Sequence, residues 1–353
     1  MSQRIAALRE SLHGLQLDVL LVSDLINMSY VSGFTGDNGL LCVGDDLQHL
    51  VTDGRFETQA PREAPDFEVL IAPKSLSDSA VELLRGVRAQ RVGFEADHLT
   101  FSCYQDLQKK LKPVKLVPTR GLVGQLRMVK DAHEIALIRE AVLTADRAYE
   151  RIRPRLRPGR RERAVAVEIE RLLRSEGAAK PAFDTICASG PNAAMPHATP
   201  TERQFQDRDL VKLDFGAQRQ RYCSDLTRTV CLGKPTTRQR RVYNTVRTAQ
   251  LKAIEAVRPG VKASKVDRAA RRHIEEKGFG KLFKHGLGHG VGLQVHERPR
   301  VGRTSDDVLQ PGMVITIEPG IYIEDWGGVR LEDMVLVTED GCEVLTTAPK
   351  PRL

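Results

Sequence analysis

Four carboxylates in the C-terminal half of this 353-residue chain accompany short apolar segments. Asp214 stands near the end of segment 211–215, and Asp225 comes 11 residues later. Glu318 directly follows segment 314–317, and Glu332 comes 14 residues after it. Each spacing suits a hairpin that brings both acids to one spot. Any one acid could be a strand-end carboxylate on a solvated loop, but four together would repel one another without a cation between them.

Histidines that could join these acids lie in two segments. His285, His289 and His296 fall within 12 residues, beside glycines at positions 286, 288, 290 and 292. So many glycines will not hold a helix, and they predict an extended or turning backbone that lies close to a ligand. His197 lies in a polar, proline-rich loop and, by itself, could be an exposed loop histidine. A single histidine is more often structural than a ligand, but three so close together favour a site.

Carboxylates and imidazoles without thiolates suit a divalent ion such as Mn²⁺, Co²⁺ or Zn²⁺. Carboxylates from both halves of the pattern could bridge two ions. Two ions roughly 3.5–4 Å apart can hold a hydroxide between them and polarise a carbonyl. The residues alone therefore predict a two-metal hydrolase in which histidine donates a proton or stabilises an oxyanion.

The N-terminal third of the chain has the pattern of an α/β domain with a mixed sheet. Short apolar runs alternate there with helix-like stretches at residues 80–84 and 104–111. The runs are residues 17–22, 40–43, 67–71, 92–94 and 114–117.

A long amphipathic helix follows this region. Asp131 and Glu134 resemble a capping box, and apolar residues then recur every three or four positions from Ile135 to Tyr149. We place the domain boundary just before this helix, which gives an N-terminal domain of residues 1–123 and a C-terminal domain of residues 124–353.

The C-terminal domain contains an internal repeat. An Arg-Pro-Gly turn ends at Gly159, and a helical stretch then runs to Gly177. The same turn and the same terminal glycine recur 101 residues later, at Gly260 and Gly278. Each copy is followed by strand-like segments that carry two acids: 211–215 and 226–231 after the first, 314–317 and 329–337 after the second. Two similar helices could arise by chance, but the repeated acids favour two related α/β halves that face each other across a cleft.

Composition narrows the function classes. The net charge is +8, but the 54 Lys and Arg residues are mingled with 46 acids, and aromatic residues make up only 5% of the chain, so a nucleic-acid partner is not favoured. The six cysteines lie far apart without a C-x-x-C pair, and the N-terminus has no secretory h-region. No apolar run is long enough to span a membrane. These features predict a cytoplasmic protein with reduced thiols.

The motifs together resemble the proline-specific metallopeptidases of the pita-bread fold, which include aminopeptidase P and prolidase and, more distantly, methionine aminopeptidase and creatinase. The resemblance covers nearly the whole chain. Its motifs are Asp-Phe-Gly at 214–216, Asp225 before Thr-Arg-Thr at 227–229, His-Gly-x-Gly-His-Gly at 285–290, Ile-Glu-Pro-Gly at 317–320 and Arg-x-Glu-Asp at 330–333. It implies a creatinase-like mixed α/β N-terminal domain and a pita-bread C-terminal domain with an internal pseudo-twofold repeat.

The resemblance also implies roles for individual residues. The metal ligands would be Asp214, Asp225, His289, Glu318 and Glu332, holding two divalent ions, with Mn²⁺ favoured and Co²⁺ or Zn²⁺ open. A metal-bridging hydroxide would attack the carbonyl before a proline while Glu318 accepts its proton. His197, His285 and His296 match substrate-binding and catalytic histidines. Arg330 would hold a ligand carboxylate in place, and Tyr322 would line the proline pocket with His285.

The choice between activities depends on the N-terminal domain. Residues 30–36 and 52–56 are more similar to aminopeptidase P than to prolidase, and Arg55 is a candidate for substrate binding in either. The resemblance therefore implies an Xaa-Pro aminopeptidase that acts on peptides with proline at the second position, with an Xaa-Pro dipeptidase as the alternative and a homodimer as the expected assembly. A non-enzymatic binding protein that kept the fold is a distant alternative, because all five metal ligands are present.

Overall fold

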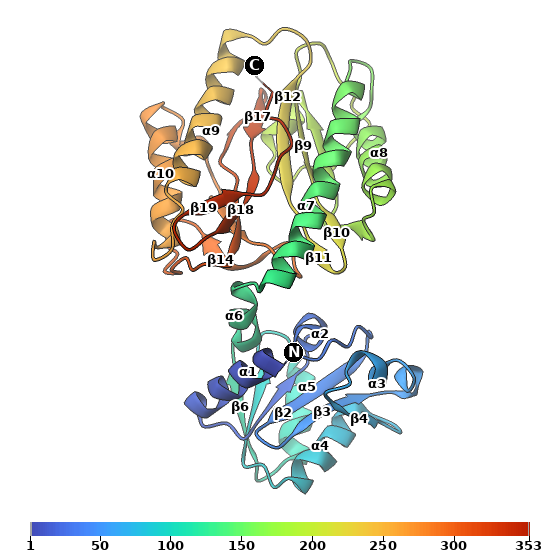
Figure 1. Ribbon diagram of the computed structural model, residues 1–353. Helices are drawn as coiled ribbons and strands as arrows, with labels where there is room; N and C mark the ends of the chain where they lie inside the picture. Colours follow the sequence, from blue (N-terminus) through green and yellow to red (C-terminus); the bar gives the residue numbers. More distant parts are fainter. Residues whose placement is uncertain (1, 352) are drawn as a thin grey trace. The chain divides into compact units, whose positions relative to one another are not determined.

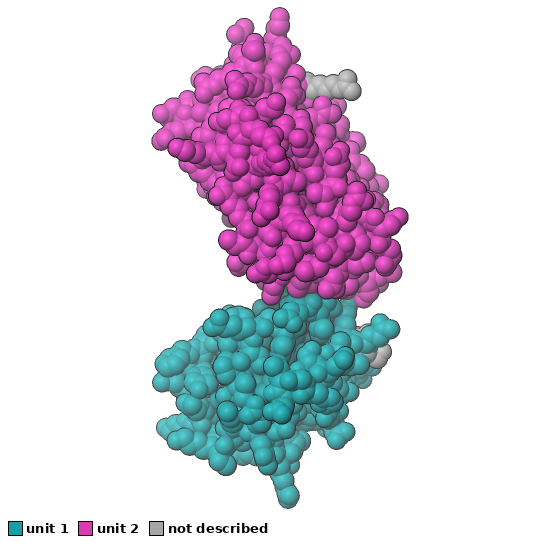
Figure 2. Space-filling view, turned by 90° about the vertical axis from the view of Figure 1, so that its left-hand side faces the viewer, with its two compact units in different colours: residues 1–127 teal, residues 128–353 magenta. Residues whose placement is uncertain are grey.

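The computed structural model describes residues 2–351 and 353, and these divide into two compact units, Met1–Arg127 and Met128–Leu353. Figure 2 shows the two units in different colours. The boundary expected after residue 123 falls inside helix α6 (Leu122–Met128), close to the division between the units. Each unit is described separately below.

The first unit contains a six-stranded mixed sheet in the order β4-β3-β2-β1-β5-β6. All five runs predicted from the sequence are strands, while β3 was not predicted. Three of the five strand pairings are parallel (β3–β4, β1–β5 and β5–β6), and the other two are antiparallel. The strands are β1 (Val19–Val22), β2 (Gly39–Gly44), β3 (Gln48–Thr52), β4 (Glu68–Ile71), β5 (Arg91–Glu95) and β6 (Lys115–Thr119).

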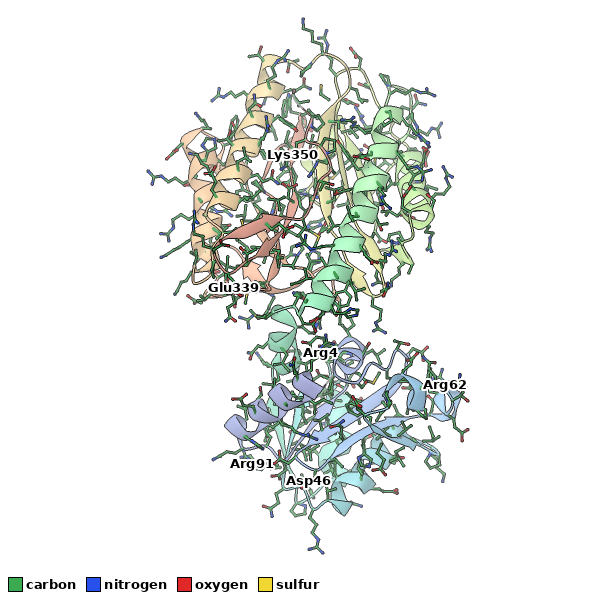
Figure 3. All side chains as sticks on the ribbon, in the orientation of Figure 1. Arg4, Asp46, Arg62, Arg91, Glu339 and Lys350 are labelled. Carbon is green, nitrogen blue, oxygen red and sulfur yellow. The ribbon has the colours of Figure 1, made fainter. Side chains whose placement is uncertain are left out.

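Helices surround this sheet, and two of them are the helical stretches expected from the sequence, α4 and α5. In Figure 3, Arg4 of α1 extends toward α2, where its guanidinium lies 4.1 Å from the ring centre of Tyr30. Such a cation–π contact fixes the two helices to each other. The helices are α1 (Ser2–Leu15), α2 (Leu25–Ser32), α3 (Ala60–Glu63), α4 (Leu76–Gly86) and α5 (Phe101–Lys110), with a 3₁₀ turn at Gly54–Phe56.

The second unit begins with the predicted long helix, α7 (Ala132–Ile152). Its capping box is formed: the side chain of Asp131 accepts from the backbone of Glu134, and the Glu134 side chain accepts from the backbone of Asp131. The periodic apolar residues Ile138, Val142 and Tyr149 are buried, as the spacing predicted.

The repeat is present in the helices. Helices α8 (Glu162–Ser175) and α10 (Ala263–Glu276) each span 14 residues, and their bounds differ by 101 positions. The glycines that follow them, Gly177 and Gly278, have φ values of 104° and 83°, which a side chain would disfavour. A further helix, α9 (Thr237–Glu255), precedes α10 as α7 precedes α8, and it was not predicted. Helices α7 and α8 lie on one side of the strands, and α9 and α10 on the other (Figure 1).

Two antiparallel pairs carry the acids. They are β9 (Leu210–Phe215) with β12 (Leu226–Cys231), and β15 (Val314–Ile317) with β18 (Asp333–Val337). The segment expected as one strand over 329–337 is two strands, because β17 (Gly327–Arg330) pairs with β16 (Gly320–Ile323) and the chain then crosses to β15. The others are β7 (Lys180–Pro181), β8 (Ile186–Ser189), β10 (Ala217–Arg219), β11 (Tyr222–Cys223), β13 (Gly288–Gly290), β14 (Glu297–Val301) and β19 (Cys342–Val344).

Each half of the second unit has its own apolar core. One core packs α9 and α10 against β15, β17 and β18, and the other packs α7 and α8 against β9 and β12. Each acid-bearing strand pair is therefore held by the helices of its own half. None of the described helices is both long enough and apolar enough to cross a membrane.

Candidate metal centre

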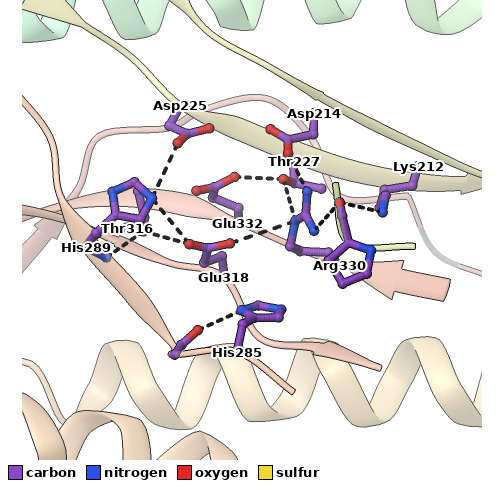
Figure 4. Close-up of polar contacts among 12 residues, drawn as sticks. Lys212, Asp214, Asp225, Thr227, His285, His289, Thr316, Glu318, Arg330 and Glu332 are labelled. Carbon is purple, nitrogen blue, oxygen red and sulfur yellow. Dashed lines mark hydrogen bonds and ion pairs between the residues drawn. The ribbon is translucent and has the colours of Figure 1, made fainter. Parts of the chain in front are cut away.

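The two hairpins bring all four predicted acids to one cavity of about 500 Å³ in the second unit. In the first pair, Asp214 lies opposite Thr227, and Asp225 immediately precedes β12. In the second pair, Glu318 and Glu332 flank the last paired residues of β15 and β18. Figure 4 shows the four carboxylates facing one another across a small space.

His289 completes this group. Its Nε2 atom lies 3.7 Å from Oδ2 of Asp225 and 3.4 Å from Oε1 of Glu318. Its Nδ1 atom lies 3.1 Å from the carbonyl oxygen of Gly290, which fits an Nδ1–H donor. Burial would lower the pKa of His289, but the hydrogen bond and charge of Glu318 outweigh it and raise that pKa, so in the metal-free site Nε2 carries a proton that a metal ion would replace. Ligand atoms of Asp225, His289 and Glu332 all lie within 4.8 Å of one another, which is the spacing of a metal site.

Three carboxylate oxygens in this group have no hydrogen-bond partner among the described residues, although they are fully buried. They are Oδ1 of Asp214, Oδ1 of Asp225 and Oε1 of Glu332. A buried, unpaired carboxylate oxygen is costly, and a divalent cation is the partner that satisfies several such oxygens at once. The donor set of carboxylates and one imidazole therefore fits a divalent metal.

The electrostatics agree with this interpretation. Burial and the charges of Glu332, Asp214 and Glu318 raise the pKa of Asp225 well above its usual value, and burial with the charges of Glu318 and Asp214 raises the pKa of Glu332 to about 8. Burial would also raise the pKa of Glu318, but the hydrogen bond and charge of His289 outweigh it and lower that pKa to about 2. Without a cation, the site therefore favours protons on two of its acids.

Arg330 connects the acids to the neighbouring loop. The side chain is buried, and its guanidinium forms an ion pair with Asp214 and lies 3.8 Å from Oε2 of Glu318. It also donates to the Tyr322 hydroxyl at 2.8 Å and to the carbonyl of Pro196 at 3.1 Å. Arg330 thus occupies the position expected of a residue that orients a ligand carboxylate.

The histidines outside the acid cluster line the same cavity. His285 has both ring nitrogens bonded: Nδ1 lies 2.7 Å from the carbonyl of Gly286, and Nε2 lies 2.9 Å from the Tyr322 hydroxyl. One neutral tautomer satisfies both bonds, with Nδ1–H donating and Nε2 accepting from the hydroxyl. Burial lowers the pKa of His285, which favours this neutral form.

His296 and His197 are placed nearer the open part of the cavity. The His296 ring packs edge-on to that of His289, with 4.3 Å between ring centres, and burial followed by the charge of His289 lowers the pKa of His296. His197 lines the cavity from the loop that follows the 3₁₀ turn Gly190–Ala194. A neutral imidazole at either position could donate one N–H to a developing oxyanion.

Close packing of neighbouring backbone, and not only the nearness of the cavity, explains the glycines of the histidine segment. The segment is extended, as predicted, and Gly288 lines the cavity. However, a Cβ atom at Gly288 would lie 2.0 Å from the carbonyl oxygen of Thr316, and one at Gly290 would lie 2.1 Å from that of Arg298. These two glycines allow neighbouring backbone to pack against β13, which brings His289 close to Glu318.

Two of the expected site residues do not line the cavity. Tyr322 is buried behind it, and its hydroxyl bonds to His285 and Arg330. Arg55 belongs to the first unit, where its guanidinium pairs with Asp53, and the described residues that line this cavity do not include it. The others all do: His197, Asp214, Asp225, His285, His289, His296, Glu318, Arg330 and Glu332.

Several contributing residues were not predicted. Thr227 donates its hydroxyl to Oε2 of Glu332 at 2.7 Å, and the Thr316 hydroxyl accepts from the backbone of His289 at 3.1 Å. Each threonine lies two positions from an acid of the site, so the two-residue period of a strand could have identified it. Lys212 also lies two positions from Asp214, on the same strand.

Comparison with known proteins gives the family of this site. Residues 136–339 match the model of metallopeptidase family M24, and residues 4–129 match the creatinase/prolidase N-terminal domain. The chain belongs to metallopeptidase family M24. Its fold is accordingly a creatinase-type N-terminal domain followed by a pita-bread domain, as the sequence predicted.

Relatives cover the M24 chain almost completely. An Xaa-Pro dipeptidase of Pyrococcus horikoshii is 37% identical over 348 residues, which are 98% of this chain and 97% of that protein. The structure of an Xaa-Pro dipeptidase from Bacillus anthracis superimposes with a TM-score of 0.97 at 38% identity, covering 99% of this chain and 98% of that one. The structure of an X-Pro aminopeptidase from Thermotoga maritima gives 0.89 at 34% identity, covering 95% and 97%. Membership of M24 implies divalent metal ions, in agreement with the donor set described above.

Proposed function

We propose that this M24 metallopeptidase hydrolyses the bond between an N-terminal residue and a following proline. The observation that carries the proposal is the cluster of buried, unpartnered carboxylate oxygens beside His289, open to a cavity lined by three further histidines. The names of the relatives, which are Xaa-Pro dipeptidases and an X-Pro aminopeptidase, support proline specificity.

Five residues would hold two divalent ions: Asp214, Asp225, His289, Glu318 and Glu332. When bound, such ions supply a nucleophile at neutral pH and polarise the scissile carbonyl. The ionised carboxylate of Glu318 accepts a proton, and Arg330 keeps Asp214 oriented. The imidazoles of His296 and His197 donate to the carbonyl oxygen as negative charge develops on it.

His285 has a different part in the proposal. Because both of its ring nitrogens are bonded to protein groups, the ring presents carbon edges and a face to the cavity instead of a free proton donor. Such a surface suits the ring of proline, whose nitrogen bears no hydrogen. Tyr322 contributes from behind by holding His285 and Arg330.

The length of the substrate decides between the two activities. Among the described residues that line the cavity, Arg330 is the one arginine or lysine, and its guanidinium is engaged by Asp214 and Tyr322. A dipeptidase needs a cation for the carboxylate of its proline residue, and an adjoining cavity that shares His289 and His296 is lined by Arg298 and Arg300. The similarity of residues 30–36 and 52–56 to aminopeptidase P is therefore what favours an aminopeptidase that admits longer peptides. The dipeptidase names of two relatives favour the alternative.

A matched pair of substrates tests the proposal. Purified protein loaded with Mn²⁺ is assayed with Ala-Pro and Ala-Pro-Ala, with Ala-Ala-Ala as the control for proline specificity. We expect alanine to be released from both proline substrates, faster from the tripeptide. Cleavage of Ala-Pro with an inert Ala-Pro-Ala would establish the dipeptidase alternative, and faster cleavage of Ala-Ala-Ala than of either would refute proline specificity.

The metal and the assembly belong to the same proposal. We expect Mn²⁺ to support the highest activity, with Co²⁺ and Zn²⁺ as the ions to compare after the protein is freed of metal. We also expect a homodimer, as the family resemblance implies, and a cytoplasmic location, as the cysteine pattern and the N-terminal sequence predict. Light scattering on the eluting protein measures the mass, and a mass of one chain would contradict the dimer.

A further inference from the structure

Lys212 is a buried cation with no part in the proposed chemistry. It lies on β9, two residues before Asp214, and its side chain is fully buried. Its acceptors among the described residues are all backbone carbonyls, those of Met195 at 2.5 Å, Pro196 at 3.0 Å and Ala193 at 3.5 Å. Because a buried ammonium group is costly, three carbonyls turned toward it indicate a specific structural purpose.

The carbonyl of Pro196 is where that purpose is clearest. This single oxygen accepts from Nζ of Lys212 at 3.0 Å and from Nη1 of Arg330 at 3.1 Å, so two buried basic side chains meet at one peptide group. Figure 4 shows Lys212 and Arg330 turned toward the same place. Pro196 directly precedes His197, which lines the cavity. Arg330 in turn pairs with Asp214, so the His197 segment is tied to the strand that bears a predicted metal ligand.

The ends of the same loop are fixed from another element. Glu162, in the first turn of α8, accepts from the backbone N–H of Ser189 at 2.7 Å and from that of Thr201 at 3.0 Å. These contacts close the loop at its base but lie several residues from His197. Lys212 and Arg330 hold its centre, and Arg330 also contacts the acids, so Lys212 is the anchor whose contacts are confined to the loop and the Tyr322 ring.

We propose that Lys212 is a positioning residue for His197, which it holds at the cavity through the carbonyls of Met195 and Pro196. The proposal rests on the proposed function, because it takes His197 as a group that contacts the substrate. Lys212 itself touches no reacting atom. Removing its ammonium group takes the donor from the Met195 carbonyl and leaves the Pro196 carbonyl to Arg330 alone, so the centre of the loop loosens and the His197 imidazole shifts while the acids keep their positions.

The first test measures the loop without using activity. Hydrogen exchange of segment 193–199 is compared in wild type, Lys212→Met, Lys212→Gln and Val266→Ala, a control that removes buried apolar volume from α10. We expect about tenfold faster exchange in this segment for Lys212→Met, a smaller increase for Lys212→Gln, whose amide can still donate to one carbonyl, and no change for Val266→Ala. Unchanged exchange in both Lys212 variants would overturn the proposal.

The second test asks whether Lys212 acts through His197. Kinetics on the better proline substrate are measured for Lys212→Met, His197→Ala and the double variant, each with bound metal quantified. We expect kcat to fall by about 100-fold in Lys212→Met, the cost of a misplaced group, with normal metal content and little further loss in the double variant. Losses that multiply, or loss of metal, would show that Lys212 acts elsewhere. If wild type cleaves no proline peptide, the proposed function fails, whereas the exchange result still decides the anchoring.

Discussion

The hairpin of β9 and β12 and the hairpin of β15 and β18 each supply two acids to one cavity, but they place those acids differently. Asp214 lies within the ladder, opposite Thr227, while Asp225 lies just outside it. In the second hairpin, Glu318 and Glu332 both lie just beyond the pair formed by residues 317 and 333. Glutamate side chains are longer than aspartate side chains, so Glu318 and Glu332 can reach the same site from positions beyond the paired residues. The repeated halves therefore supply the site with different acids.

The partners of the acids also differ within each hairpin. Asp214 pairs with Arg330, and Glu318 lies 3.4 Å from Nε2 of His289. Glu332 accepts from the Thr227 hydroxyl, and Asp225 lies 3.7 Å from the same His289 atom. Asp214, Asp225 and Glu332 each keep one buried oxygen without a partner among the described residues, but it is the pKa of Asp225 and the pKa of Glu332 that burial and the neighbouring acids raise. When metal is absent, the site therefore disfavours the charged form at one acid of each hairpin, so Asp225 and Glu332 depend most on bound metal.

The largest expected effect comes from removing one of these dependent acids. Asp225→Asn deletes a ligand while it preserves shape, so we expect activity to fall by about 10³-fold or more, the equivalent of several kcal/mol of lost polarisation. The rise in melting temperature on addition of Mn²⁺ should shrink as well, because a ligand stabilises in proportion to its occupancy of the folded state. Kinetics and thermal melts with and without metal measure both effects.

Asp146 offers a matched control for that experiment. It is a buried aspartate whose Oδ1 atom also has no partner among the described residues, but it accepts from Thr347 and lies outside the cavity lining. Asp146→Asn should leave activity and the metal-dependent melting shift unchanged. If the two variants behaved alike, buried acids in general, and not the hairpin acids, would account for the result.

A smaller effect tests how the two hairpins support each other. Thr227 of the first hairpin donates to Glu332 of the second, and its oxygen also accepts from Nε of Arg330 at 3.1 Å. Thr227→Val keeps the volume and removes both bonds, so we expect metal affinity to fall by about 10–100-fold, as for other groups that orient ligands. Titration with Mn²⁺ measures the change, and Thr245→Val on α9 is the control. Equal affinities in the two variants would mean that the hairpins bind metal independently.

The affinity of the site for metal is expected to change about tenfold per pH unit. In the metal-free site, burial and the charges of Glu318 and Asp214 raise the pKa of Glu332 to about 8, so its carboxyl group must release a proton when metal binds at pH 7. Affinity should therefore rise by about tenfold per pH unit, for each proton released, until the pH exceeds that pKa. Calorimetry in buffers of different ionisation enthalpy counts the protons. If metal bound without releasing protons, the Glu332 carboxyl group would already be ionised in the metal-free protein, which would contradict its raised pKa.

The free energy of unfolding of the metal-free protein should fall as pH rises, whereas the affinity for metal should rise. The folded protein binds more protons than the unfolded chain between the ordinary pKa of a glutamate and about 8, so the free energy of unfolding should fall as pH rises through this interval. Urea denaturation of metal-free protein at several pH values measures this slope. With saturating Mn²⁺ the slope should weaken or reverse, which separates the contribution of the acids from that of the rest of the chain.

The fold was predictable wherever the signals were local. The turn and cap glycines of α8 and α10, such as Gly177, mark helix ends through their own backbone conformation, so the repeat could be read from the sequence. The division of segment 329–337 could not be predicted, because only the partner strands decide that the chain changes sheets before Glu332. Strand β3 and helix α9 were likewise missed.

The acids of the site were predictable because four carboxylates buried close together are destabilising unless a metal ion binds them. The supporting residues were harder to predict. A lysine at position 212 resembles any surface lysine of an amphipathic strand, and its burial follows from the course of the loop at 193–197. Gly288 lines the cavity, as predicted, but its close packing also depends on a carbonyl 28 positions away, that of Thr316, which the sequence could not indicate.

The smallest expected effect concerns Tyr322, whose hydroxyl contacts His285 and Arg330 beside the acids of the second hairpin. Burial raises its pKa to about 12, so it remains a neutral hydroxyl that donates to His285 and accepts from Arg330. Tyr322→Phe removes two hydrogen bonds worth about 1 kcal/mol each, so we expect roughly a 5- to 30-fold loss in kcat/KM. The loss should appear in KM for proline substrates, because His285 loses its fixed orientation, and metal affinity should not change. A fall in metal affinity instead would show that Tyr322 acts through Arg330 on Asp214, so that the position of this ligand depends on the Tyr322 hydroxyl.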